Sequence, residues 1–361
     1  MLRRHLFCAA SAMLMSEYSA LQGALSGKRL GLAIHSYSNR WKAKPTSLKY
    51  PPFQDVLDVM DHCHSIGVSS LQISVQDWDR DKAQKARASS ESYDMNLEGI
   101  IRLPQAPGDV PRFTQELRLG REAGARVFCA AMGGRRFEIF TQMEDFERWK
   151  VSTLAALALA EPVARRLGAY LAVENHQDFE MHELLALVKK VASKHVGICL
   201  DTGNNLALLE VPMAVVEALA PYAFTVHLKD ISIRSVAAGF EMAEVPLGKG
   251  IFDLPAMVNT IRRAAPLAEF HLEMTTRNPL LIPCLSEQYW TTFPQKPGVD
   301  LVRTLALAQQ QIGKKSLMRI SELSSEARLN LEETNILESL YFAAEKLGFS
   351  SEKMKALKVD E

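Results

Sequence analysis

From about residue 29 onward, short runs of apolar and β-branched residues alternate with longer stretches whose apolar residues recur at helical spacing. Several helical stretches end at a glycine, for example Gly67, Gly124 and Gly168, which is a typical helix stop signal. Eight strands separated by helices predict an α/β fold, the (β/α)8 TIM barrel. The predicted strands cover residues 29–35, 69–74, 96–103, 126–131, 170–174, 196–200, 224–227 and 269–273, and the predicted helices 53–66, 79–93, 111–123, 144–167, 181–192, 206–219 and 254–264.

A doubly wound open sheet is the alternative arrangement of the same elements. The first predicted strand is not followed by a G-x-G-x-x-G motif, so the sequence gives no support to a dinucleotide site. After the last strand, residues 277–297 are irregular and rich in proline and aromatic residues. Residues 298–312 predict the helix that closes the barrel, and a charged helical tail follows. We therefore expect a barrel over residues 28–313 and a helical C-terminal extension over 314–361, with its solvated helices packed on the barrel's outside.

The N-terminal 27 residues form a separate segment in this interpretation. Arg3 and Arg4 precede a short apolar run at residues 8–15, a pattern that resembles a bacterial Tat export signal. The run is too short to anchor the chain in a membrane. We expect a periplasmic or exported protein whose mature form is not held in the membrane, and the alternative is an N-terminal extension on a cytoplasmic enzyme.

The charge balance argues against a nucleic-acid-binding protein, and the cysteine pattern argues against a disulfide-rich one. The 42 basic and 42 acidic residues give a formal net charge of zero, whereas a nucleic-acid-binding protein usually has a basic excess. The five cysteines are scattered and contain no C-x-x-C pair, so a disulfide framework is not expected. Cys63, Cys129 and Cys199 lie in apolar runs and are interpreted as small buried hydrophobic residues.

Four polar residues stand at the ends of the last four predicted strands: Glu174, Asp201, His227 and Glu273. The carboxyl ends of barrel strands converge on one mouth, where the active sites of such enzymes lie. Taken singly, each of these residues is equally well explained as a solvated or a packed side chain without a functional role. Together they provide nitrogen and oxygen ligands suited to one divalent ion, Mn²⁺, Mg²⁺, Co²⁺ or Zn²⁺.

Residues flanking this quartet are candidates for contacts with a substrate. Strand alternation places His176 on the same side as Glu174, and Lys229 on the same side as His227. Asn204 follows Asp201 in a turn that leads out of the strand. The Gly248-Lys249-Gly250 segment is either a loop that approaches a ligand closely or a plain turn. No clear cluster of arginines indicates a phosphate clamp, and Arg277 and Arg234 are no more than candidates for contacting a substrate phosphate.

The motifs around these residues resemble those of the xylose-isomerase-like superfamily, and within it the sugar phosphate isomerase/epimerase group. The resemblance covers roughly residues 29–313. It implies that Glu174, Asp201, His227 and Glu273 are metal ligands and that the two glutamates also shuttle the proton, as in the ketose epimerases. It rests on five short motifs in order: Val-Glu-Asn-His at 173–176, Leu-Asp-Thr-Gly-Asn at 200–204, Val-His-Leu-Lys-Asp at 226–230, Pro-Leu-Gly-Lys-Gly at 246–250 and Leu-Glu at 272–273.

Departures from the family pattern restrict the function. The type IV apurinic endonucleases of this superfamily bind three metals and carry a His where this chain has Asn204. Their Asp-x-His before the glycine loop falls near residues 242–244, where no such pair exists. A three-metal nuclease is therefore not expected. Tyr289 and Trp290 lie in what resembles an insert over the mouth, where aromatic rings either stack on a sugar or simply pack.

We expect a metal-dependent isomerase or epimerase acting on a sugar or keto-sugar, with Mn²⁺ first among the candidate metals. One of Glu174 and Glu273 abstracts a proton next to a carbonyl, giving a metal-stabilised enediolate, and the other returns it. Lys229 and His176 bind hydroxyls or support the negative charge. The alternative is a lyase or dehydratase, for example one that eliminates from a 3-keto-glycoside. A non-catalytic sugar-binding barrel is a further alternative. The expected partner is a small carbohydrate, and formation of a homo-oligomer is left open.

Overall fold

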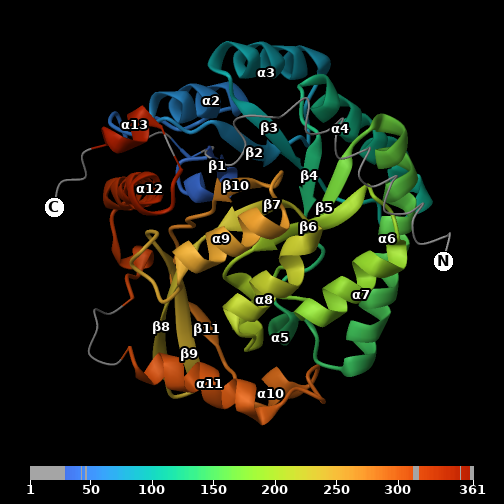
Figure 1. Cartoon of the computed structure of the whole chain (residues 1–361), viewed down its shortest axis with the longest axis vertical. Helices are drawn as coiled ribbons and strands as arrows, with labels where there is room; N and C mark the ends of the chain where they lie inside the picture. The colour runs from blue at the N-terminus through green and yellow to red at the C-terminus, as the bar shows by residue number, and fades with distance from the viewer. Residues whose placement is uncertain (1–28, 42, 45–46, 312–316, 350, 358–361) are drawn as a thin grey trace.

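The structure is a computed structural model and describes residues 29–41, 43–44, 47–311, 317–349 and 351–357. Eight parallel strands close into a barrel in the order β1-β10-β7-β6-β5-β4-β3-β2, which confirms the predicted (β/α)8 class (Figure 1). Each predicted strand is present, with ends shifted by one to three residues at most. The barrel strands are β1 (Leu30–Ala33), β2 (Ser70–Ser74), β3 (Asn96–Ile100), β4 (Val127–Ala130), β5 (Tyr170–Glu174), β6 (Val196–Asp201), β7 (Ala223–Leu228) and β10 (Glu269–Leu272).

Helices surround the barrel and bury their apolar faces against it (Figure 1). The predicted helix over residues 206–219 is in fact broken, because Leu209 adopts a left-handed conformation (φ 61°) and Pro212 starts a new helix. The preceding residues form the short helix η3 (Asn204–Leu208). The remaining surrounding helices are α2 (Val56–Ser65), α3 (Arg80–Tyr93), α4 (Val110–Glu122), α6 (Met143–Leu167), α7 (Met181–Val191), α8 (Pro212–Leu219) and α9 (Leu254–Ala264), with short helices η1 (Ile34–Tyr37), η2 (Pro107–Asp109), α5 (Arg136–Ile139) and η4 (Ala220–Tyr222).

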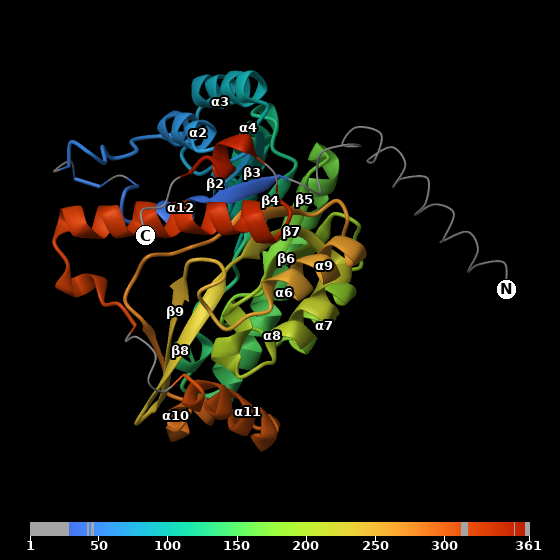
Figure 2. The same ribbon diagram turned by 60° about the vertical axis from the view of Figure 1, so that its left-hand side comes forward.

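A second, three-stranded sheet stands beside the barrel and was not predicted (Figure 2). It contains the antiparallel hairpin β8 (Asp230–Val236) and β9 (Gly239–Val245), with β11 (Leu280–Ile282) paired to β9. Helix α11 (Gly298–Gln309) packs on β8 and β9. The prediction that residues 298–312 close the barrel is therefore wrong, because the apolar face of this helix is covered by the small sheet. The short α10 (Glu287–Trp290) precedes it.

The C-terminal helix α12 (Ser325–Lys346) packs beside β10 and η1. Ile336 and Leu340 of α12 belong to the main hydrophobic core, and Glu332 is fully buried. The expected helical extension packed on the barrel's outside is confirmed for α12, but the face that it turns to the barrel is part of the hydrophobic core and is not solvated. The C-terminal part also contains η5 (Ile320–Glu322) and α13 (Glu352–Lys355).

The predicted Tat-type segment, residues 1–27, lies outside the described residues. Within the part of the chain that the structure describes, none of the helices has the length and apolar character needed to cross a membrane.

Candidate metal centre

Four residues predicted from the strand ends converge at the mouth of the barrel. Glu174 ends β5, Asp201 ends β6, His227 lies on β7, and Glu273 directly follows β10. All four side chains are buried, and their ligand atoms lie within 4.8 Å of one another. The Nδ1 atom of His227 lies 3.3 Å from Glu174 Oε1, 3.4 Å from Glu273 Oε2 and 3.9 Å from Asp201 Oδ2.

Strand register and local hydrogen bonds hold this arrangement. Asp201 is paired in register with His227 across β6 and β7. Its Oδ1 atom accepts hydrogen bonds from the backbone N–H groups of Gly203 (2.8 Å) and Asn204 (2.7 Å), so that Oδ2 is left for the centre. Asn175 fixes the backbone of β6, because its Oδ1 accepts from Asp201 N and its Nδ2 donates to Asp201 O. The Asp201 carboxylate is thereby oriented before any ligand binds.

Lys229 is the one lysine buried among these carboxylates in the described structure. Its Nζ lies 2.9 Å from Asp201 Oδ2 and 2.7 Å from Glu273 Oε2. Burial opposes its charge, but the two carboxylates outweigh that effect and raise the pKa of Lys229. Burial likewise opposes ionisation of Glu273, yet Lys229 and His227 hold the pKa of Glu273 well below its usual value.

The pKa values of the other three quartet residues are also shifted, because these ionisable groups are buried close together. Burial raises the pKa of Asp201 to about 6, against the opposing effect of Lys229. For Glu174, burial disfavours the ionised form, but His227 outweighs it and the pKa lies below its usual value. For His227, burial disfavours the cation, but Glu273 and Glu174 raise its pKa well above the usual value. Three carboxylates lie close to one imidazole, so a positive charge at the centre is electrostatically favourable.

The donor set fits a divalent cation. Asp201 Oδ2 and Glu273 Oε2 are buried, and within the described residues neither accepts a hydrogen bond of acceptable geometry, although both lie near the ammonium of Lys229. The three buried carboxylates of the quartet outnumber the cationic side chains of Lys229 and His227 beside them, and a divalent ion would offset the excess negative charge. Three carboxylates and one imidazole suit Mn²⁺, Mg²⁺, Co²⁺ or Zn²⁺. The thiols of Cys129 and Cys199 also lie beside His227, a proximity that the sequence analysis did not anticipate.

The four predicted substrate contacts lie in three different surroundings. Asn204 and Lys229 are part of the centre, since Asn204 Nδ2 donates to Glu174 Oε1 (3.2 Å) and its Oδ1 lies 3.5 Å from Lys229 Nζ. His176 is partly exposed, and its Nδ1 is buried and has no hydrogen-bond partner among the described residues. Arg277 is already engaged, because its guanidinium forms a two-point ion pair with Glu244 of β9.

Three contact residues of the centre were missed in the sequence. His35 Nδ1 donates to Glu273 Oε1 (2.9 Å), and Gln72 Oε1 lies 2.7 Å from His227 Nε2. Asn175 was assigned only to the opposite face of its strand from Glu174. His35 ended the first predicted strand, as the quartet residues end theirs, and this signal was available. Gln72 lies in the middle of an apolar strand, where a polar residue that points inward was the available signal.

Two further segments that the sequence analysis singled out serve packing. Tyr289 is fully buried and donates its hydroxyl to Ala207 O, so its ring is not available to stack on a sugar. The indole of Trp290 donates to Cys284 O. In the glycine loop, the backbone N–H groups of Gly248 and Gly250 donate to Asp230 Oδ2, and a Cβ at Gly250 would overlap that carboxylate. The loop therefore wraps around Asp230.

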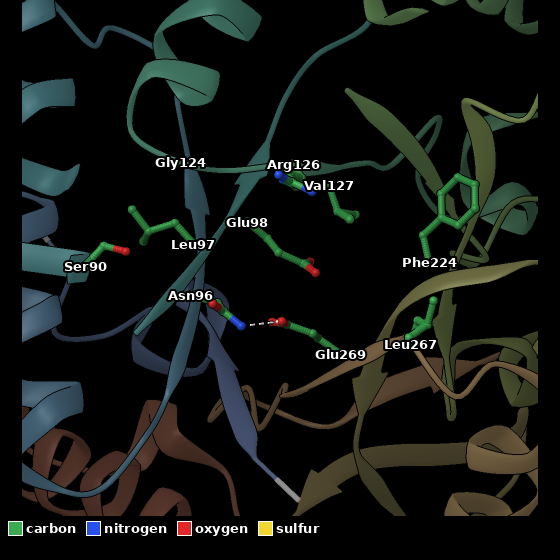
Figure 3. A pocket seen from close by; sticks show the side chains of 10 residues that line it. All are labelled: Ser90, Asn96, Leu97, Glu98, Gly124, Arg126, Val127, Phe224, Leu267 and Glu269. Carbon is green, nitrogen blue, oxygen red and sulfur yellow. Dashed lines mark hydrogen bonds between the residues drawn. The ribbon is translucent and has the colours of Figure 1, made fainter. Parts of the chain in front are cut away.

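A cavity of about 220 Å³ lies at the opposite end of the barrel, where the strands begin (Figure 3). Its wall includes Asn96 and Glu98 of β3 and Glu269 of β10. Catalytic residues of TIM barrels come from the other end of the strands, and residues at this end contribute to stability. The quartet rather than this cavity is the candidate centre.

The chain is similar in sequence to a known protein over part of its length and in fold to several solved structures. A 111-residue stretch is 33% identical to the 3-oxo-isoapionate decarboxylase of Pectobacterium atrosepticum, and it covers 30% of this chain and 40% of that protein, less than half its length. The fold resembles a D-psicose 3-epimerase determined in the presence of D-fructose, with a TM-score of 0.54 at 13% identity, covering 89% of this chain and 99% of the other.

A second solved structure with this fold is a xylose isomerase-like TIM-barrel protein from Mycobacterium smegmatis in complex with magnesium. Its TM-score is 0.52 at 12% identity, covering 80% of this chain and all of the other. Residues 60–290, which contain the whole quartet, match the family described as xylose isomerase-like TIM barrel. The chain belongs to the xylose isomerase-like TIM-barrel family.

Proposed function

We propose that this protein is a divalent-metal-dependent isomerase or epimerase that acts on a sugar or keto-sugar. The observation that carries the proposal is the convergence of Glu174 and Glu273 on the same imidazole nitrogen, at 3.3 and 3.4 Å, within one cluster of metal-type ligands. Two glutamates in one centre supply both a base and an acid. The fold shared with an epimerase supports the same chemistry.

The four members of the quartet would hold the ion, and a bound divalent ion supplies a Lewis acid that polarises a substrate carbonyl. One glutamate takes the proton from the carbon next to that carbonyl, and the other returns a proton to the same carbon or its neighbour. In the ligand-free site the low pKa of Glu273 and of Glu174 keeps both carboxylates ionised, so the glutamate that returns a proton must first take one up from solvent. The Lys229 ammonium lies beside Glu273 and is placed to donate to an oxygen that becomes negative.

His35 gives Glu273 a route to solvent. Its Nδ1 bonds to Glu273 Oε1, and half of the His35 side chain is exposed. A proton held on Glu273 therefore exchanges with solvent through His35 more readily than one on Glu174, whose Oε1 accepts from the buried Asn204 amide. We assign Glu273 as the glutamate that exchanges its proton with water between turnovers.

A second candidate is a decarboxylase or other lyase of the same family. It is favoured by the stretch that is 33% identical to a 3-oxo-isoapionate decarboxylase. Loss of carbon dioxide from a 3-oxo acid leaves its electron pair on the adjacent carbon as an enolate, the same type of intermediate as proton removal. Such an enzyme needs only the proton donor of the pair. Among the metals we propose Mn²⁺, with Mg²⁺, Co²⁺ and Zn²⁺ as alternatives.

The test is turnover in D₂O, followed by NMR, with ketoses and 3-oxo sugar acids as substrates. An isomerase or epimerase leaves deuterium in a rearranged sugar of unchanged carbon number, whereas a decarboxylase releases carbon dioxide and a shortened, deuterated ketose. Glu273→Gln is expected to lower turnover by about 100- to 10,000-fold, the usual contribution of an acid/base group, while Mn²⁺ stays bound. Glu338→Gln, on the outer helix α12, is the matched control. Full activity in Glu273→Gln would exclude the acid/base assignment.

The remaining proposals concern the molecule as a whole. We propose a small carbohydrate as the partner, and export through the N-terminal twin-arginine segment with a cytoplasmic location as the alternative. Fusion of residues 1–27 to a reporter that is active only after export tests this directly. A homo-oligomer is tested by light scattering on the purified protein.

A further inference from the structure

Polar side chains occupy the interior of the barrel directly beneath the quartet. Gln72 of β2, Glu98 of β3, Thr225 of β7 and His271 of β10 are all at most 4% exposed. Bulky aliphatic residues usually dominate this interior in TIM barrels. A buried polar group is costly unless it is hydrogen-bonded, so these residues require a structural reason.

A chain of hydrogen bonds runs from His227 of the centre through Gln72 to Glu98. The His227 Nε2 and Gln72 Oε1 atoms lie 2.7 Å apart. The other end of the same amide, Gln72 Nε2, donates to Glu98 Oε2 at 3.1 Å. Figure 3 shows Glu98 projecting from β3 into the barrel, on the wall of the cavity at the strand starts. Because Glu98 accepts from the amide nitrogen of Gln72, the amide oxygen of Gln72 points toward His227.

We propose that Gln72, oriented by Glu98, is a positioning residue that makes Nδ1 of His227 the metal-binding nitrogen. A carbonyl oxygen can only accept, so Gln72 Oε1 requires a proton on His227 Nε2. The neutral ring then carries its lone pair on Nδ1, the atom that faces Glu174, Asp201 and Glu273. This inference rests on the proposed metal-dependent function and names how one ligand of that centre is prepared.

The magnitude follows from the behaviour of partners that orient metal-binding histidines. Loss of such a partner typically costs about 10–100-fold in metal affinity. Here the effect is expected within that range, because Gln72 Oε1 lies 2.7 Å from His227 Nε2, although the Cys129 thiol also lies beside the imidazole. Without Gln72, a neutral His227 is free to carry its proton on Nδ1, where it meets the ion.

Two substitutions at position 72 separate positioning from packing. Gln72→Leu keeps roughly the size of the side chain but removes the acceptor, whereas Gln72→Glu keeps an acceptor oxygen for His227 Nε2. If Gln72 only fills space, the leucine variant binds metal normally and the buried glutamate is the harmful change. Positioning gives the reverse order. Glu98→Leu is expected to have an intermediate effect, because it frees the amide of Gln72 to rotate.

The experiment is titration of chelator-stripped full-length protein with Mn²⁺ by calorimetry. We expect the dissociation constant to rise 10–100-fold in Gln72→Leu, and to stay within about threefold of wild type in Gln72→Glu. Circular dichroism confirms that each variant is folded. In the Mg²⁺-loaded wild type, nitrogen-15 NMR of the histidine side chains is expected to show His227 protonated at Nε2.

The outcomes distinguish this inference from the proposed function. Wild-type protein that fails to bind any divalent ion would overturn the metal-dependent function itself. Wild-type protein that binds Mn²⁺, with Gln72→Leu within twofold of it, would overturn the positioning role and leave the function standing. A His227 protonated at Nδ1 in the loaded protein would do the same.

Discussion

Glu332 of α12 is expected to be a major anchor of the C-terminal helix on the barrel. The side chain is fully buried, and its carboxylate accepts three hydrogen bonds from the segment that follows η1. Oε2 accepts from Asn39 N (2.7 Å) and Asn39 Nδ2 (2.8 Å), and Oε1 accepts from Arg40 N (3.0 Å). The substitution Glu332→Ala removes the acceptor of all three donors.

The expected loss of stability is about 3–4 kcal/mol at about pH 5, where the raised pKa keeps the buried Glu332 largely protonated and its burial carries little charge penalty. A buried donor left without its acceptor costs about 1–3 kcal/mol, and the low end applies here because Asn39 is partly exposed and water can reach it. The small void left by the side chain adds about 1 kcal/mol. With a shift of about 2 °C per kcal/mol for a chain of this size, the melting temperature falls by about 6–8 °C.

Urea unfolding and thermal melting of Glu332→Ala measure both quantities. Glu338→Ala is the matched control, since Glu338 lies on the same helix and pairs with Lys249, whose side chain is 60% exposed. An exposed ion pair of this kind contributes less than about 1 kcal/mol. Equal destabilisation by the two variants would refute the reasoning that burial and the three shared donors make Glu332 an anchor.

Three further predictions follow from buried charges. Burial raises the pKa of Glu332 to about 7 from its ordinary value of 4.5, so between these values the folded state binds more protons than the unfolded state. Raising the pH from 4.5 to 7 therefore lowers wild-type stability by about 3 kcal/mol relative to Glu332→Gln, and parallel pH profiles in urea unfolding would contradict this. Arg136 is buried, pairs with Glu183 at 2.6 Å and lies over the rings of Phe146 and Phe293. Arg136→Met should cost about 3–5 kcal/mol in the same assay, and a loss below 1 kcal/mol would show that the pair is dispensable. Adding Mn²⁺ at 100 times its dissociation constant to chelator-stripped protein should stabilise it by about 2.7 kcal/mol. Asp201→Ala, which removes the ligand oxygen altogether, should largely abolish that gain, and an unchanged melting temperature of wild type on metal addition would exclude a site formed by the quartet.

The barrel could be predicted because its signals are local. Each strand is a short apolar run, and each surrounding helix repeats its apolar residues at helical spacing. The eight-strand pattern can therefore be predicted from residues that are close together in the sequence. The quartet could be predicted for a related reason, since parallel strands of a barrel end at one mouth and Glu174, Asp201, His227 and Glu273 mark four strand ends. The break at Leu209 and Pro212 was missed because apolar spacing continues across it.

The sequence by itself thus determined the barrel, the order of its strands along the chain and the four residues that meet at its mouth. Only the tertiary structure decided which polar residues serve that mouth. Gln72 and His35 contact His227 and Glu273 from strands and loops more than 150 residues away in sequence. It also decided that Arg277 is neutralised by Glu244, and that α12 rather than α11 covers the barrel beside β10. The physical reason is the same in each case. An apolar face or a buried charge in the sequence indicates that a partner is needed, but which residue becomes that partner depends on how the barrel closes in space.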